Sequence, residues 1–197
     1  MKLLLILLTL NLNLMSLIFT EDENIHEIYF GGGCFWCVEA VFEDVKGVLN
    51  VVSGYSGGSS KDAMYSMVSS GKTKHAEVCK ITYDKSKIKL NQLLEIFFLT
   101  HDPTTLNRQG HDIGHHYRSI IFFNDSSENE IIKKYIVKLN KKLFDNSIVT
   151  EVKKFEAFYI AEDYHQDYYK LNTKQPYCNA VISPKLIKAR NELNKFY

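Results

Sequence analysis

The chain has 197 residues, with 24 basic and 23 acidic side chains and a formal net charge of +1. This length fits one domain, and the 12 Phe and 12 Tyr residues provide enough apolar material for one core. A near-neutral chain without a basic stripe gives no electrostatic reason to expect nucleic acid as a partner.

The first residues of the chain predict a secretory signal peptide. Lys2 is followed by an apolar run, and no further charge appears before Glu21. A membrane-spanning helix needs about 20 apolar residues, whereas this run is shorter and contains Asn11 and Asn13. A charged start and a short apolar run are typical of a leader, and an uncleaved anchor is the alternative. We therefore expect residues 1–20 to be a signal peptide and the protein to be exported, periplasmic or secreted, without stable membrane insertion once the leader is removed.

After the leader, predicted strands and helices alternate without a linker. In chain order, the patterns predict strand His26–Gly31, helix Cys34–Gly47, strand Val48–Tyr55, helix Asp62–Val68, strand His75–Tyr83, helix Leu90–Thr100, loop Thr104–His116, strand Ser119–Phe123, helix Ser126–Phe144, strand Thr150–Phe155, a helix near Glu162–Leu171 and a last helix from Pro184. The predicted loop Thr104–His116 is long for a compact domain, and loops of this length are often functional. The series predicts one α/β or α+β domain with a central sheet over residues 21–197.

The strongest local motif is the glycine run Gly31–Gly33 followed by Cys34 and Cys37. Glycines let the backbone approach a ligand, and they deliver Cys34 to the first turn of a helix. Free backbone N–H groups and the helix dipole at that position predict a lowered pKa for Cys34 and a reactive thiolate. Cys37 lies on the same helical face, within reach of an oxidised Cys34 sulfur. A structural metal clip is the alternative, but a single C-x-x-C lacks the second pair that zinc needs, so we expect no metal.

Five sequence blocks occur in an order that resembles one enzyme family. They are GGCFWC around Cys34, SGYSGG (Ser53–Gly58), KHAEV (Lys74–Val78), HDPTT to HHYRS (His101–Ser119) and FYIAEDYHQDYY (Phe158–Tyr169). Together they are similar to the blocks of peptide methionine sulfoxide reductases of the A type. The resemblance implies a two-layer α/β sandwich with a ferredoxin-like central mixed sheet and flanking helices. It also implies reduction of the S epimer of methionine sulfoxide, free or in proteins, to methionine.

The same resemblance implies a set of site residues with different roles. They are Cys34 as nucleophile, Glu77 as the acid that protonates the sulfoxide oxygen, Tyr65, Tyr117 and Asp112 as further polar groups, and Phe35 and Trp36 as the wall of the methyl pocket. The residue types suit the chemistry, because attack on a sulfoxide places negative charge on oxygen and requires a positioned acid. Burial on a strand would raise the pKa of Glu77. The alternative for Glu77 is a surface salt bridge, since lysines stand at positions 74 and 80.

Two cysteines are candidates for resolving a Cys34 sulfenic acid through an intramolecular disulfide. The family more often has Gly at the position of Cys37, and it commonly carries a recycling cysteine in a glycine-rich tail. Here that region contains Cys178 without the glycines. We expect Cys37 to react first, because a neighbour three residues away loses little loop-closure entropy. Cys178, in a terminal segment able to move, would pass the disulfide to a thioredoxin-like dithiol donor. No bound cofactor and a monomer are expected.

Two other functions fit part of the pattern. An exported C-x-x-C after a strand is compatible with a thioredoxin-like disulfide oxidoreductase, although that fold needs a proline facing the dithiol and the chain has only 3 prolines. A non-enzymatic domain stapled by Cys34–Cys37 and Cys79–Cys178 disulfides is the second alternative. A domain of this size can bury a sufficient core without such staples, and Cys79 is more typical of a small buried strand residue.

Overall fold

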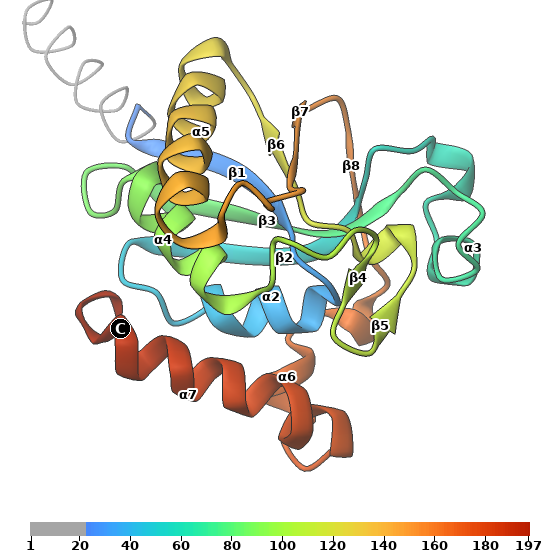
Figure 1. Ribbon diagram of the computed structural model, residues 1–197. Coiled ribbons are helices and arrows are strands. Elements are labelled where there is room, and N and C mark those ends of the chain that lie inside the picture. The colour runs from blue at the N-terminus through green and yellow to red at the C-terminus, as the bar shows by residue number, and fades with distance from the viewer. Residues whose placement is uncertain (1–22) are drawn as a thin grey trace, which may run out of the picture.

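A computed structural model describes residues 23–197 (Figure 1). The signal peptide predicted for residues 1–20 lies outside this range. The strands are β1 (Ile25–Gly31), β2 (Val48–Ser56), β3 (Ala76–Asp84), β4 (Arg108–Gln109), β5 (Asp112–Ile113), β6 (Ile120–Phe123), β7 (Glu151–Lys154) and β8 (Phe158–Ile160). The α-helices are α2 (Phe35–Phe42), α3 (Tyr65–Val68), α4 (Leu90–Thr100), α5 (Ser126–Leu139), α6 (Tyr168–Leu171) and α7 (Ser183–Glu192). Short 3₁₀ turns occupy Ser60–Asp62, His115–Tyr117, Asp163–His165 and Asn194–Phe196, and π-helical turns occupy Asn140–Phe144 and Cys178–Ile182.

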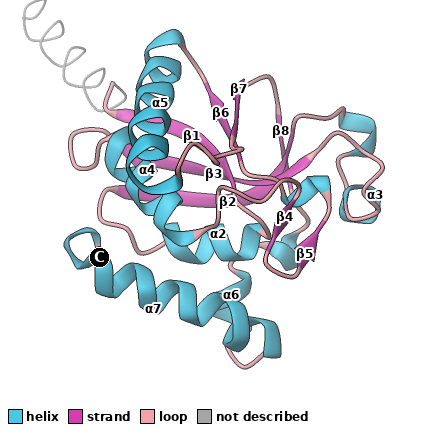
Figure 2. Cartoon of the chain, in the orientation of Figure 1, coloured by secondary structure: helices cyan, strands magenta, loops and turns pink. Residues whose placement is uncertain are grey.

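The central sheet has the strand order β7-β6-β1-β3-β2-β8, and β4 and β5 form a separate hairpin (Figure 2). Its four middle strands belong to two units, β1-α2-β2 and β3-α4-β6, whose strands interleave. Within this set of four, neighbouring strands are antiparallel to one another. This is the ferredoxin-like arrangement. At the edges, β7 is parallel to β6 and β8 is antiparallel to β2. The predicted mixed sheet is therefore confirmed.

The two faces of the sheet are covered differently. Helices α2, α4 and α5 lie over one face, with α7 packed outside against α2 and α4 (Figure 1). The alternation of β3 sends Cys79 and Ile81 to this face, where they join the main core. On the other face Tyr29 and Val78 belong to a smaller apolar cluster covered by Phe155. The helix-covered face therefore holds the larger core, and it is the face on which α2 begins.

The helix predicted over Cys34–Gly47 ends at Phe42, and three larger differences from the predicted elements lie in the second half of the chain. The helix predicted near Glu162–Leu171 is broken at Asp167, whose φ is +50°. The carboxylate of Glu39 accepts the backbone N–H of Tyr168 at 3.2 Å, and this bond holds the chain in the break. Strand β8 was not predicted, because it has three residues and pairs only with a distant strand. The predicted loop before Tyr117 contains the β4–β5 hairpin.

Within residues 23–197, no helix combines the length and the apolar character needed to cross a bilayer.

Candidate active site

The glycine run between β1 and α2 places Cys34 at the first turn of α2. Gly33 has a φ of +95°, a conformation that glycine adopts without strain, and Cys34 is the N-cap residue of α2. A Cβ on Gly31 would lie 2.8 Å from the backbone oxygen of Glu77, so glycine is needed where β1 and β3 approach. The turn thus brings the Cys34 thiol beside the middle of the sheet, with 7% of the residue exposed.

Glu77 lies in β3 next to this turn, as the sequence predicted. Its Oε2 accepts the backbone N–H of Phe35 at 3.1 Å, and the residue is 1% exposed. Burial is the main cause that raises the pKa of Glu77 to about 8, while the Phe35 N–H opposes the shift. The alternative of a surface salt bridge is wrong, because Lys80 pairs with Glu27 at 3.1 Å. A carboxyl group that stays protonated at neutral pH is therefore hydrogen-bonded to the residue that directly follows Cys34.

The two thiols of the C-x-x-C motif form a hydrogen-bonded, buried pair. The prediction of a lowered pKa at Cys34 is wrong: burial raises it well above its ordinary value, and the hydrogen bond with Cys37 adds to the shift. The same hydrogen bond lowers the pKa of Cys37 to about 7, against the effect of burial. The pair can carry one negative charge near neutral pH because the two sulfurs share a proton, with Cys37 as the acceptor.

The two aromatic residues after Cys34 have different environments. Phe35 is 1% exposed, and its ring packs 4.9 Å from that of His165. Trp36 is partly exposed and stacks on Tyr168 with ring centroids 3.5 Å apart and planes 5° apart. Trp36 and Tyr168 therefore offer an accessible apolar surface beside Cys34, whereas Phe35 supports it from below.

The predicted tyrosines both come to this site. The backbone N–H of Tyr65 donates a hydrogen bond of 2.8 Å to Glu162 Oε1. The centroid of the Tyr65 ring lies 4.5 Å from that of His165. Burial raises the pKa of Tyr65 and of Tyr117, and the charges of Glu77 and Cys34 raise both further. Both hydroxyls consequently remain protonated donors in the electrostatic field of Glu77 and Cys34.

The β4–β5 hairpin carries Asp112 into the site. Gln109 ties the hairpin down, because its side-chain amide makes hydrogen bonds of 3.1 and 3.0 Å with the backbone of Asp102. The Gln109 side chain also covers the glycine turn, since a Cβ on Gly33 would lie 2.6 Å from its Cγ. Asp112 accepts a hydrogen bond from the hydroxyl of Tyr177 at 2.8 Å. The hairpin is thus fixed against the turn that presents Cys34.

The C-terminal segment contributes residues that sequence reasoning did not assign to the site. Tyr177 Oη lies 3.7 Å from Cys37 Sγ, and Tyr168 stacks on Trp36. A tyrosine directly before a candidate cysteine was the signal for Tyr177, and the aromatic block Phe158–Tyr169 was the signal for Tyr168. Cys178 is fully buried at the start of a π-helical turn. The sequence predicted a terminal segment able to move at this position, and the structure has Cys178 in a buried helical turn.

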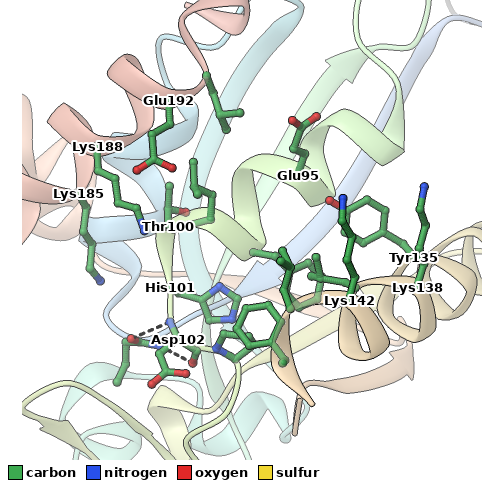
Figure 3. A pocket seen from close by; sticks show the side chains of 18 residues that line it. Glu95, Thr100, His101, Asp102, Tyr135, Lys138, Lys142, Lys185, Lys188 and Glu192 are labelled. Atoms are coloured by element: carbon green, nitrogen blue, oxygen red, sulfur yellow. Dashed lines mark hydrogen bonds between the residues drawn. The ribbon is translucent and has the colours of Figure 1, made fainter. Parts of the chain in front are cut away.

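A cleft of about 950 Å³ lies elsewhere, between α4, α5 and α7 (Figure 3). Lys185 and Lys188 stand on one side of it and Lys138 and Lys142 on the other, and none of the predicted site residues lines it. Thr100, His101 and Lys185 also border a small cavity behind Cys37. Cys37 lines this cavity, whereas Cys34, Trp36 and Tyr168 do not.

All four cysteines are free thiols. Cys79 is 0% exposed, as expected for a small strand residue, and its Sγ donates to the backbone oxygen of Phe35 at 3.3 Å. In the described part of the chain, no three His, Cys, Asp or Glu side chains are grouped so that they could hold a metal ion.

A family model described as peptide methionine sulfoxide reductase matches residues 26–196. The chain belongs to this family. A "Peptide methionine sulfoxide reductase MsrA" of Trichodesmium erythraeum is 52% identical over 164 residues, which cover 83% of this chain and 93% of the relative. Membership in the family makes the chain an oxidoreductase, and the thioredoxin-like and non-enzymatic alternatives are not favoured.

Solved structures agree with this assignment. Reduced Mxr1 of Saccharomyces cerevisiae is similar with a TM-score of 0.74 and 31% identity, covering 79% of this chain and 90% of Mxr1. Mxr1 in complex with Trx2 is similar with a TM-score of 0.53 and 25% identity, covering 74% of this chain and 86% of that one.

Proposed function

We propose that the protein reduces the S epimer of methionine sulfoxide, free or within proteins, with Cys34 as the nucleophile. One observation carries the proposal: the buried carboxyl of Glu77 accepts the N–H of Phe35 at 3.1 Å, beside the Cys34 thiol. Its pKa of about 8 leaves it protonated at neutral pH. A thiol and a protonated acid in one small site are the two groups that sulfoxide reduction requires.

In the proposed first step, the sulfur of Cys34 attacks the sulfoxide sulfur while Glu77 gives its proton to the sulfoxide oxygen. Cys37 takes up the proton that Cys34 loses. The oxygen then passes to Cys34, so methionine leaves and Cys34 becomes a sulfenic acid. Methionine sulfoxide is reduced by two electrons and Cys34 is oxidised by two, and the Glu77 proton stays on the sulfenic acid. In this proposal, the hydroxyls of Tyr65 and Tyr117 stabilise the developing charge on oxygen.

We propose that selectivity for one epimer comes from apolar and polar groups that bind different substituents of the sulfoxide sulfur. The methyl group of the substrate would lie on Trp36 and Tyr168, because stacked rings offer a flat apolar surface. The oxygen would point to Glu77. A site that fixes these two substituents on opposite sides accepts only one configuration at sulfur.

We propose that recycling passes through a Cys34–Cys37 disulfide. Cys37 attacks the sulfenic acid, and water leaves. Cys178 then takes over the disulfide and passes it to a thioredoxin-type dithiol protein, which reduces it. The similarity to Mxr1, which has been solved in complex with Trx2, supports this donor class. The burial of Cys178 means that its segment must shift before it can act.

We also propose that the enzyme acts outside the cytoplasm. The support is the sequence of residues 1–20 alone, with a lysine followed by a short apolar run. Expression of the full chain, followed by fractionation and N-terminal sequencing, tests this point. Intact protein that remains in the cytoplasmic fraction would contradict it.

The decisive experiment is a reductase assay with each purified epimer and dithiothreitol as the reductant. We expect turnover of the S epimer and very little of the R epimer. Equal turnover of both epimers would refute the selectivity, and an absence of turnover would refute the function itself.

A further inference from the structure

Cys37, Tyr177 and Asp112 form a series of side-chain contacts that the reduction of the sulfoxide does not use. Tyr177 Oη donates a hydrogen bond to Asp112 Oδ2 at 2.8 Å, and the same oxygen lies 3.7 Å from Cys37 Sγ. Cys37 is 2% exposed, whereas Tyr177 and Asp112 are partly exposed. The contacts therefore lead from a buried thiol to a carboxylate in contact with solvent.

The single hydrogen of the Tyr177 hydroxyl fixes the direction of these hydrogen bonds. A tyrosine hydroxyl has one hydrogen, and Tyr177 gives it to Asp112. Its oxygen consequently presents a lone pair to Cys37, so Cys37 is the donor in that contact once it has taken up the proton that Cys34 loses in the first step. Each group in the series donates to the next, and a proton can move outward from Cys37 without any side chain turning.

We propose that Tyr177 and Asp112 form a proton relay that deprotonates Cys37 when it attacks the Cys34 sulfenic acid. Tyr177 touches the reacting sulfur and acts as a catalytic residue, and Asp112 acts through Tyr177. The inference rests on the proposed function and on Cys37 as the resolving thiol.

The step balances as follows. The Cys37 sulfur forms a bond to the Cys34 sulfur, and the sulfur–oxygen bond of the sulfenic acid breaks. The Cys37 proton passes to Tyr177 while the Tyr177 proton passes to Asp112, which releases it to solvent. The departing hydroxide takes up a proton from solvent and leaves as water, which balances the proton that Asp112 releases. Thiol and sulfenic acid become disulfide and water without any external oxidant or reductant.

After the transfer, the hydroxyl of Tyr177 points at the new thiolate and stabilises it. In agreement with this, the contact with Tyr177 lowers the pKa of Cys37. The other charged groups near Cys37 are Lys185 of α7, whose charge lowers the pKa of Cys37 further, and Glu77 of β3. His101 borders the cavity behind Cys37 and is neutral, because burial lowers its pKa to about 4. Replacing the Tyr177 hydroxyl leaves these groups in place.

The test separates methionine formation from disulfide formation in one turnover. Reduced enzyme is mixed with one equivalent of the S epimer without reductant, quenched at short times and alkylated, and its peptides are identified by mass spectrometry. In Tyr177→Phe we expect disulfide formation to slow by about 10²-fold more than methionine formation, the low end for loss of acid–base catalysis. We expect a similar result for Asp112→Asn, whose amide oxygen accepts the Tyr177 hydrogen bond but does not take up the proton.

Two further measurements distinguish a proton relay from a structural effect of the Tyr177 substitution. The disulfide step of Tyr177→Phe should recover as the pH rises from 7 to about 9.5, because solvent base then deprotonates Cys37. Tyr169→Phe is the matched control, since it removes a hydroxyl in the same segment that bonds Ser183 at 2.9 Å, and it should form the disulfide at the wild-type rate.

Three results would overturn the relay. They are a wild-type rate of disulfide formation in Tyr177→Phe, an equal slowing of both steps without recovery at high pH, and a first wild-type disulfide between Cys34 and Cys178. Failure of the wild-type enzyme to form methionine is a separate result, which would refute the proposed function.

Discussion

The two sides of Cys34 are built from different parts of the chain. The acid side consists of Glu77 on a central strand, a buried residue held by the backbone of Phe35. The thiol side consists of Cys37 and the C-terminal segment, where Tyr177 and Cys178 lie in or beside a π-helical turn. The first is part of the ferredoxin-like core, and the second is a later segment of chain packed against α2.

This difference separates two chemical tasks. A strand paired on both sides keeps Glu77 dry and fixed, which raises its pKa and lets it hold a proton. Recycling requires thiols to change partners, and an irregular helical segment rearranges more easily than a central strand. In the proposed mechanism the acid side serves substrate reduction and the thiol side restores the enzyme, so mutations on the two sides should affect different steps.

The largest effect is expected at the sulfur that both sides share. Cys34→Ser should abolish methionine formation, because the proposed mechanism forms the sulfenic acid on Cys34. Serine is a favoured N-cap residue, so the variant should fold with a circular dichroism spectrum like that of the wild type. Measurable turnover by the folded variant would mean that another thiol is the nucleophile.

On the acid side, Glu77→Gln should lower single-turnover methionine formation by about 10²–10⁴-fold, the usual contribution of a positioned acid. The amide oxygen still accepts the N–H of Phe35, so substrate affinity should change little. A rate within a few-fold of the wild type would show that a tyrosine or water supplies the proton.

On the thiol side, Cys37→Ser and Cys178→Ser should behave differently after one equivalent of substrate. Cys37→Ser should lose its second thiol about 10²-fold more slowly than the wild type, because the nearest partner of Cys34 is absent. Cys178→Ser should lose two thiols at the normal rate but turn over slowly with a thioredoxin-type donor. Thiol titration measures both, and loss of two thiols at the wild-type rate in Cys37→Ser would make Cys178 the direct resolving residue.

The pH dependence of the first step should also identify the acid side. The active form of Glu77 is protonated, and its pKa is raised to about 8. Methionine formation should therefore fall by about tenfold per pH unit above that value, and this decline should be absent in Glu77→Gln. A wild-type rate that stays constant up to pH 10 would exclude Glu77 as the proton donor.

The smallest effect is expected at the apolar surface formed by Trp36 and Tyr168. Tyr168→Leu removes the ring on which Trp36 stacks, and an aromatic pair of this kind contributes about 0.5–1.5 kcal/mol. KM should rise by about 2- to 10-fold with little change in kcat, whereas Tyr168→Phe, which keeps a ring, should resemble the wild type. Steady-state kinetics at constant pH decide this, and a fall in kcat alone would place Tyr168 outside the binding surface.

Much of the fold was predictable because it depends on local patterns. The apolar alternation of β3 and the helical spacing of α4 gave nearly the observed bounds. The break at Asp167 was not predictable, because it depends on a bond between Tyr168 and Glu39, 129 residues away. Strand β8 was missed for the same reason, since its pairing with β2 is its main support.

The site was predictable as far as its sequence blocks extend. Cys34 and Glu77 stand in two of these blocks, and the structure brings them together. The contact between Cys37 and Tyr177 joins residues 140 positions apart, one of which lies outside the blocks. The direction of the pKa shift at Cys34 was missed because the helix-dipole argument assumes an exposed sulfur, whereas burial dominates here.

Trp36 has a consequence for how this enzyme can be observed. It is the only tryptophan in the sequence, and its indole is stacked on Tyr168 beside the reactive sulfur. Tryptophan emission excited near 295 nm therefore comes from the proposed substrate site and from no other part of the protein. Binding, oxidation of Cys34 and movement of the C-terminal segment should each alter the surroundings of this one fluorophore. The catalytic cycle can thus be followed by stopped-flow fluorescence on the unlabelled protein.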